Sequence, residues 1–261
     1  KRESVYVFKN IRKNYSKNEI CKQYNWNNQM KILGIYAHTF LDGNYVQGWR
    51  TFTDNYEWLK STLEFASKQK KFNFIVKPHP MDHFYTKSKM TTADLIQKFV
   101  DKYENIKFFP KDMTLNSGLK IIDVAITSHG TVSLEFLCFG KPCITAGRTS
   151  WGDVVLNEKP ISKRQYFDKI KNAEKLNKPS KKIIKKLFSY IYIQDNLMAI
   201  DHPLLADILV YRNVDRNKYW KKNLNLFKNY NLKNDLFRKN FEYQVKKNLR
   251  HTINLAKFKK L

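Results

Sequence analysis

One stretch of this chain, residues 121–153, constrains the fold more than any other. It opens with an apolar run at 121–126 (IIDVAI) that predicts a strand and ends in a small polar turn, Thr-Ser-His-Gly, at 127–130. Apolar residues at helical spacing predict a helix over 131–139, and a glycine and a proline then precede a second apolar run at 143–146. Strand, helix and strand in this order predict one βαβ unit of a parallel sheet.

The turn at 127–130 lies where a doubly wound sheet holds an anionic ligand. Backbone N–H groups at the start of a helix lack partners and carry partial positive charge, which favours a phosphate. Ser128 and Thr131 add hydroxyl donors, and Gly130 allows the backbone to come close. The same residues would also serve as an ordinary helix cap, so a phosphate site depends on what the other strands bring to this edge.

Predicted strands and helices alternate through the first two thirds of the chain. A continuous apolar run typical of a strand buried on both faces lies at 31–37, and further strands are predicted at 72–77 and 106–109. Amphipathic patterns predict helices at 56–68, 92–103, 114–119 and 162–176. This alternation predicts an α/β fold with a Rossmann-like parallel sheet.

Composition divides the chain into three parts. Residues 1–29 are polar and weakly periodic, which predicts a linker or the trailing part of an upstream domain. Residues 30–178 hold the predicted Rossmann-like domain. Residues 179–261 are predicted to form a basic, mostly helical extension, with helices at 180–192 and 204–210.

The chain is strongly basic, with 49 Lys and Arg against 23 Asp and Glu and a formal net charge of +26. This charge favours polyanionic partners such as nucleic acid, an anionic membrane surface or an acidic polymer, although a Lys-rich solvated surface is the alternative. No apolar run approaches the length of a membrane span, and the first residues lack the apolar region of a signal peptide. The three cysteines show no metal-ligand spacing, and Cys138 and Cys143 are predicted to be buried thiols, which indicates a reducing, cytoplasmic compartment.

Polar side chains follow four of the predicted strands. They are His38, His79, the pair Ser128 and His129, and Arg148. Because the carboxyl ends of parallel strands meet at one edge of a sheet, we expect these side chains to lie close together. A single histidine at a strand end is usually solvated or capping, but four such ends together favour a binding site.

The predicted ligand is a nucleotide-activated sugar. Its phosphate would lie on the turn and contact His79, because a protonated histidine neutralises charge that builds on a leaving group. His38 and Asp42 are the predicted catalytic pair, with the carboxylate acting as general base or orienting one. Glu135 is predicted to reach a sugar or ribose hydroxyl, although a surface position is an equal alternative. The predicted donor-binding set is His79, Ser128, His129, Gly130, Thr131, Glu135 and Arg148.

Other chemistries have little support in the sequence. The chain has neither a GxxxxGK[ST] nor a GxGxxG motif, which argues against a P-loop NTPase and a dinucleotide dehydrogenase. Pro80 separates His79 from His83 and makes a metal-binding helix there improbable. Adjacent side chains point apart, so Ser128 and His129 are not expected to form a hydrolase pair. Neither a metal nor a bound cofactor is predicted.

Several ordered motifs resemble those of bacterial capsule polysaccharide biosynthesis glycosyltransferases with the GT-B fold. They are Lys-Pro-His-Pro at 77–80, Ser-His-Gly-Thr-Val-Ser-Leu-Glu at 128–135 and Phe-Gly-Lys-Pro-Cys-Ile-Thr-Ala-Gly at 139–147, with further likeness at 35–42 and 54–59. The resemblance implies a cytoplasmic transferase, peripherally associated with the inner membrane, that uses a nucleotide-linked sugar. Similar features occur in users of CMP-sugars and in CDP-glycerol polymer enzymes. On this likeness His79 would contact the nucleotide phosphate, and Ser128 and Thr131 would cradle it.

A GT-B enzyme has two Rossmann domains, and this chain has sequence for one, which resembles the C-terminal, donor-binding domain. The acceptor-binding half is then expected upstream of residue 1 or on another chain. The implied partners are a nucleotide-sugar donor, a glycan or lipid-linked acceptor and the anionic inner-membrane surface, with no nucleic acid. Two alternatives stay open: a CDP-glycerol-type polyol-phosphate transferase, and a non-enzymatic polyanion or nucleic-acid binder that uses the aromatic, basic C-terminal segment.

Overall fold

The chain divides into two compact units, Asn10–Phe188 and a second formed by Lys1–Lys9 with Ser189–Leu261. The computed structural model describes residues 13–41, 48, 50–82, 90–156, 159, 161–198, 216–249 and 254. The first unit ends ten residues beyond the predicted boundary at 178, because the start of α7 (Lys181–Tyr192) packs on it. Leu187 is fully buried there, and Ile184 lies over Gly140.

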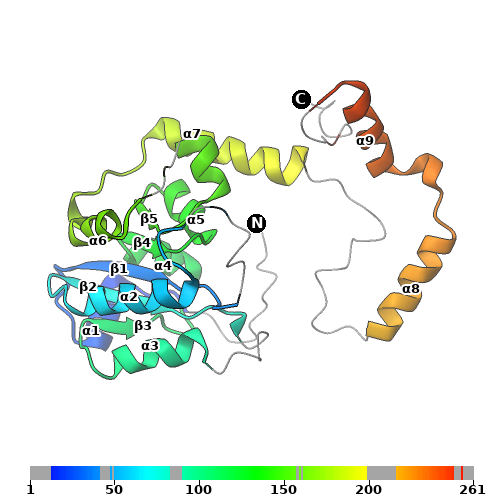
Figure 1. The fold of residues 1–261 in the computed structure, drawn as a ribbon. Helices are drawn as coiled ribbons and strands as arrows, with labels where there is room; N and C mark the ends of the chain where they lie inside the picture. The colour runs from blue at the N-terminus through cyan, green and yellow to red at the C-terminus, as the bar shows by residue number, and fades with distance from the viewer. Residues whose placement is uncertain are drawn as a thin grey trace. The chain divides into compact units, whose positions relative to one another are not determined.

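A five-stranded parallel sheet forms the centre of the first unit (Figure 1). Its strands are β1 (Lys31–Tyr36), β2 (Phe72–Lys77), β3 (Ile106–Phe108), β4 (Val124–Thr127) and β5 (Cys143–Thr145). They lie in the order β3-β2-β1-β4-β5, and all neighbours are parallel. The prediction of an α/β fold with a Rossmann-like parallel sheet is confirmed. The chain adds strands first on one side of β1 and then on the other, so the topological switch point lies between β1 and β4.

Helices cover both faces of the sheet, because successive side chains of a strand point to opposite sides. In β1, Leu33 and Ile35 belong to one buried cluster, and Ile32 and Tyr36 belong to the other. The first cluster also holds side chains of α2 (Asn55–Ser67), α3 (Thr92–Val100) and α6 (Lys163–Lys171). The second holds side chains of α1 (Lys17–Tyr24), α4 (Leu115–Ile121) and α5 (Val132–Cys138). The result is a three-layer domain.

A buried hydrogen-bond network joins α2 to α6. The indole N–H of Trp58 donates to the hydroxyl of Tyr166 at 2.9 Å, and the hydroxyls of Tyr166 and Thr62 lie 3.0 Å apart. All three side chains are buried. Buried polar groups are costly unless they are hydrogen-bonded, so this network fixes how α2 and α6 meet.

Residues 13–29, predicted with 1–12 to be a linker or the trailing part of an upstream domain, pack on the first unit. They include α1, which begins with a capping box between Ser16 and Glu19. Ile20 and Cys21 of α1 are buried in the second cluster, and Lys13 pairs with Met113 in an isolated parallel bridge. With two buried residues in eight, α1 has too short an apolar pattern for its periodicity to stand out.

Two further predictions need correction, and a third is not tested. The strand predicted over 121–126 begins only at Val124, because Ile121 ends α4 and is buried as a helical residue. Cys138 and Cys143, predicted to be buried, are half-buried, and the buried cysteine is Cys21. The helix predicted at 204–210 lies outside the described residues.

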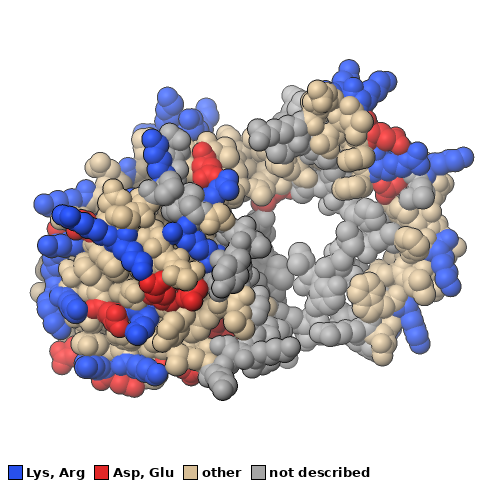
Figure 2. All heavy atoms as spheres, in the orientation of Figure 1, with Lys and Arg blue, Asp and Glu red and all other residues tan. Residues whose placement is uncertain are grey.

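The second unit contains α8 (Arg216–Lys228), the short helix η6 (Leu232–Asn234) and α9 (Leu236–Lys246). Asp235 caps α9 by accepting from the backbone N–H of Arg238. None of the helices in the described part of the chain has both the length and the apolar character needed to cross a bilayer. On the face of the first unit that Figure 2 shows, Lys and Arg side chains are spread among Asp and Glu rather than gathered in one patch.

Candidate functional site

Three histidines lie against one another at the carboxyl edge of the sheet. His79 follows β2, His38 follows β1 and His129 follows β4, so the three rings come in the order of their strands. The ring centroids of His38 and His129 are 4.0 Å apart, and those of His38 and His79 are 5.5 Å apart. The site therefore spans the topological switch point, where open α/β sheets bind their ligands.

His38 occupies the middle of this histidine cluster and is held in its neutral form. Burial lowers its pKa to about 3, and the neighbouring His129 and His79 and the charge of Arg50 act in the same direction. Its Nδ1 atom is buried and has no hydrogen-bond partner among the described residues. A buried imidazole nitrogen without a partner is costly, so this atom is a candidate contact for a group that the described residues do not supply.

His129 is more deeply buried, with 8% of its surface exposed. Burial lowers its pKa to about 4, and Arg50 adds to the effect. Its Nδ1 lies 2.8 Å from the hydroxyl of Ser128, while its Nε2 is buried without a hydrogen-bond partner among the described residues. The cluster thus contains two buried imidazole nitrogens that no part of the described protein satisfies.

The hydroxyl of Ser128, predicted to contact a phosphate, makes hydrogen bonds to two protein side chains. It is buried and donates to Oδ1 of Asn55 at 3.2 Å, in addition to its contact with His129. In this structure the hydroxyl of Ser128 is engaged by Asn55 and His129, and its predicted contact with a phosphate stays a prediction. Asn55 was missed by sequence reasoning, although it shares the apolar face of α2 with Trp58 and Leu59. An amide on a buried helix face is a usable signal of a hydrogen-bonding role.

Hydrogen bonds to both the backbone and the ring fix the orientation of His79. Its N–H donates to the hydroxyl of Thr92 at 3.0 Å, and the N–H of Met81 donates to its Nδ1 at 3.2 Å. Asp82 in turn accepts hydrogen bonds from both the N–H and the hydroxyl of Thr92. Because Nδ1 accepts a hydrogen bond, the neutral ring carries its hydrogen on Nε2, which makes Nε2 a donor.

Gly130 occupies a place that admits no side chain. A Cβ atom there would lie 2.8 Å from Oγ1 of Thr127 and 3.3 Å from Nε2 of His38. The Thr127 hydroxyl is fixed, since it donates to the carbonyl of Tyr36 and accepts from the N–H of Gly130, both at 3.2 Å. The exposed Thr131 makes no side-chain capping bond to the first turn of α5. A side chain at position 130 would therefore meet Thr127 first and His38 next. The predicted approach of the Gly130 backbone to a ligand stays a prediction.

The remaining predicted residues are less closely tied to the cluster. The guanidinium of Arg148 is exposed and pairs with Asp153. Glu135 is exposed on α5, and its charge acts on Tyr36 and Cys138. Asp42 lies outside the described residues.

Arg50 is a second residue that the sequence did not single out. It forms an isolated antiparallel bridge with Gly147, just after β5. From there its charge lowers the pKa of both His38 and His129. Its signal in the sequence was weak, because it follows a loop rather than a strand.

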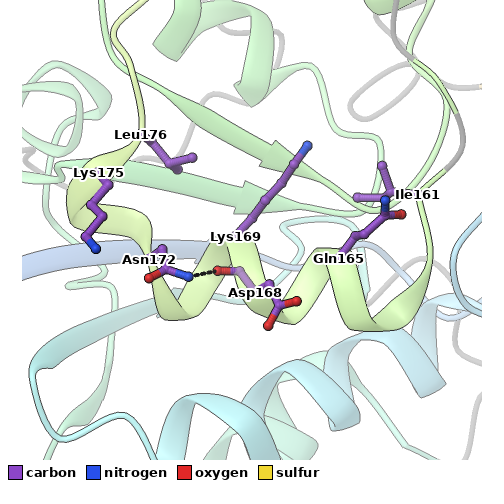
Figure 3. A pocket seen from close by; sticks show the side chains of 7 residues that line it. All are labelled: Ile161, Gln165, Asp168, Lys169, Asn172, Lys175 and Leu176. Carbon is purple, nitrogen blue, oxygen red and sulfur yellow. Dashed lines mark hydrogen bonds between the residues drawn. The ribbon is translucent and has the colours of Figure 1, made fainter.

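A separate hollow of about 360 Å³ lies against α6 and η3 (Ala173–Lys175) (Figure 3). None of the three clustered histidines lines it. It is lined by Ile161, Gln165, Asp168, Lys169, Asn172, Lys175 and Leu176. Among these residues, the side-chain amide of Asn172 donates to the backbone carbonyl of Asp168 at 2.9 Å, which is a local contact at the end of α6 (Figure 3). No buried unsatisfied polar atom lines it, so the chemistry points to the histidine cluster. Within the described residues, no group of three or more His, Cys, Asp or Glu is placed to hold a metal.

Residues 6–197 match the sequence model of a protein family described as capsule polysaccharide biosynthesis protein. The match covers more than half of the chain and includes all three clustered histidines. The chain belongs to this capsule polysaccharide biosynthesis family. A search of curated proteins returns no match.

Solved structures resemble this capsule polysaccharide biosynthesis protein only distantly. One is sucrose-phosphate synthase from Thermosynechococcus elongatus, with 12% identity, a TM-score of 0.45, and coverage of 71% of this chain and 48% of that chain. Another is UDP-GlcNAc 2-epimerase from Neisseria meningitidis bound to UDP-GlcNAc, with 14% identity, a TM-score of 0.39, and coverage of 68% and 48%. The chain thus spans about half the length of these structures. The helices α8 and α9 lie beyond the family match.

Proposed function

We propose that this chain is the donor-binding portion of a GT-B glycosyltransferase that uses a nucleotide-activated sugar to build capsule polysaccharide. The observation that carries the proposal is the histidine cluster at the switch point, with two buried imidazole nitrogens, His38 Nδ1 and His129 Nε2, lacking partners in the described structure. Membership of the capsule polysaccharide biosynthesis family supports a role in making capsule polysaccharide.

The charge of the site favours a phosphate as part of the ligand. Burial lowers the pKa of His38 most, and the neighbouring imidazoles and the charge of Arg50 also disfavour its protonation. A phosphate placed beside these groups would reverse the effect, because an opposite charge stabilises the protonated ring. His79 adds a donor through Nε2. A histidine that becomes protonated next to the phosphate can then stabilise the nucleotide as a leaving group.

A thermal-shift panel tests this proposal. CMP, CDP, UDP and GDP are each added to the full chain and compared with single-stranded RNA. We expect one or more nucleotides to raise the melting temperature, with CMP favouring a CMP-sugar donor and CDP favouring the polyol-phosphate alternative. Stabilisation by RNA alone, and only at low salt, would instead indicate a polyanion binder.

Replacing His79 by alanine should weaken nucleotide binding about tenfold, because it removes a donor to the phosphate. Isothermal titration calorimetry with the best nucleotide of the panel measures the change. His79→Gln is the matched variant, since its amide keeps an N–H near the position of Nε2 and should retain most of the affinity. Equal affinity of His79→Ala and the unchanged chain would remove His79 from the site.

We also propose that the second unit docks on an anionic membrane surface, and α8 supplies the support. Trp220, Leu224 and Phe227 lie on one helical face and are 57%, 54% and 67% exposed. The helix contains basic residues and no acidic one. An amphipathic helix with an exposed aromatic face and a basic flank is typical of binding at a bilayer interface.

Vesicle binding checks this membrane partner. The full chain should sediment with phosphatidylglycerol vesicles and not with phosphatidylcholine vesicles, and high salt should release it. Leu224→Asp should abolish binding because it places a charge in the apolar face, whereas Asn225→Asp adds the same charge to the same helix outside that face. Loss of binding in both variants alike would show that charge alone, and not the apolar face, holds the protein there.

A further inference from the structure

The hydrogen bonds behind His129 determine which of its nitrogens carries the hydrogen. The amide nitrogen of Asn55 donates to the carbonyl of Thr39 at 2.9 Å, and a carbonyl can only accept. The amide oxygen of Asn55 therefore faces Ser128, at 3.2 Å from its hydroxyl oxygen. In this hydrogen bond the serine hydroxyl is the donor, because an amide oxygen has no hydrogen to give.

The serine hydroxyl has one hydrogen, and Asn55 receives it. At 2.8 Å from His129 Nδ1, the hydroxyl oxygen of Ser128 must then be the acceptor, so Nδ1 carries the hydrogen of the neutral ring. It follows that Nε2 of His129 presents a bare lone pair. That atom is buried, and no described residue donates to it.

His129 and His79 therefore have opposite tautomers. The N–H of Met81 occupies Nδ1 of His79 and leaves a hydrogen on Nε2, whereas Ser128 leaves Nε2 of His129 without one. One histidine of the cluster offers a donor and another an acceptor. A phosphate oxygen satisfies the donor, but it cannot satisfy the acceptor, which needs an N–H or O–H group from the ligand.

We propose that Nε2 of His129 accepts a hydrogen bond from a ribose hydroxyl of the bound nucleotide, and that Ser128 and Asn55 are positioning residues that hold it in this tautomer. The inference rests on the proposed function for the identity of the ligand. Of the donors on a nucleotide, the ribose hydroxyls lie next to the phosphate, whereas an amine of the base lies beyond the ribose. Burial, and to a smaller extent Arg50, make His129 a weak base, which suits a hydrogen-bond acceptor better than a general base at neutral pH.

Two substitutions at His129 separate this role from a structural one. His129→Asn keeps a donor close to the position of Nδ1 and so keeps the contact with Ser128, but it removes the acceptor at Nε2. His129→Gln places an amide near Nε2 and keeps an acceptor there. Calorimetry uses whichever of CMP, CDP, UDP and GDP binds the unchanged chain best, together with its 2′,3′-dideoxy form. We expect His129→Asn to lose about tenfold in affinity for the ribonucleotide and His129→Gln to lose much less.

The dideoxynucleotide adds the ligand change to a double-change thermodynamic cycle with His129→Asn. It should bind about tenfold more weakly than the ribonucleotide to the unchanged chain, and His129→Asn should cause no further loss. The inference is overturned if His129→Asn binds the ribonucleotide normally, or if its loss persists with the dideoxynucleotide. If no nucleotide binds the unchanged chain, the proposed function itself fails, which is a different result.

Nitrogen-15 NMR of the histidine rings tests the positioning residues without any ligand. The chain has six histidines, so the His129 signals are assigned from their loss in His129→Asn. We expect Nδ1 of His129 to be protonated and Nε2 to be bare, and Ser128→Ala to shift the ring towards the other tautomer. An Nε2-protonated ring in the unchanged chain, or an identical spectrum in Ser128→Ala, contradicts the assignment.

Discussion

Replacing Trp58 by alanine should lower the free energy of unfolding of the first unit by about 3–5 kcal/mol. Trp58 is 1% exposed, and it packs in the cluster between the sheet and α2. Its removal also leaves the hydroxyl of Tyr166 without the indole donor that lies 2.9 Å away. Chemical denaturation followed by circular dichroism gives the change, because the signal does not depend on the missing indole.

Two companion variants make the Trp58 result specific. Trp220→Ala is the same substitution at a side chain that is 57% exposed, and it should leave the unfolding of the first unit unchanged. Tyr166→Phe keeps the ring and removes only the hydroxyl shared by Trp58 and Thr62, so it should cost about 1–3 kcal/mol. A loss from Trp58→Ala no larger than that from Tyr166→Phe would mean that the network, and not the burial of the indole, carries the stability.

Acidification from pH 7 to pH 5 should lower the free energy of unfolding of the first unit. His38 and His129 should each contribute about 2 kcal/mol to this loss. Burial and neighbouring positive groups lower the pKa of these rings to about 3 and about 4, from 6.5 when unfolded. A lowered pKa means that the unfolded chain binds protons first. The stabilisation is therefore complete above pH 6.5 and is lost as the pH falls towards the folded values.

The interval between pH 6.5 and pH 5 isolates the histidines from the carboxylates. Glu57, whose pKa is lowered to about 2 chiefly by its hydrogen bond from Lys163, loses its stabilising effect only below its unfolded value of 4.5. The double variant His38→Gln, His129→Gln should show a flat stability over this interval. If the stability of the double variant still fell steeply over this interval, groups other than these two histidines would cause the acid sensitivity. A bound nucleotide should reduce the fall in the unchanged chain, because the phosphate raises the pKa of the rings.

The sequence predicted most of the fold because the strands of this sheet are buried on both faces. Such strands are continuous apolar runs, and β2 has the same bounds as its prediction, residues 72–77. The errors occur where an apolar run is ambiguous. Ile121 is apolar whether it ends a helix or starts a strand, and α1 buries two residues, which is too few to reveal a period.

The residues that follow the strands were predicted to lie together, but the hydrogen bonds that orient their side chains were not predicted. His38, His79 and His129 each follow an apolar run, so parallel topology places them at one edge. The partners of their rings come from elsewhere in the chain. Asn55 lies 73 residues before Ser128, and only the packing of α2 on the sheet brings them together. For this reason Ser128 was expected to bind a ligand, whereas the structure shows that its hydroxyl is already engaged.

The strand order has a consequence for how this protein can be assembled. Along the chain the three histidines occur as 38, 79 and 129, but in the sheet His38 stands in the middle, because β4 returns to pair with β1. A growing chain that has made only β1, β2 and β3 already contains two of the rings, yet it exposes the edge of β1 where β4 belongs. The third ring arrives only when that edge is closed. Ligand binding should therefore be all-or-none during synthesis and refolding, and it would report the docking of β4 rather than the formation of the earlier strands.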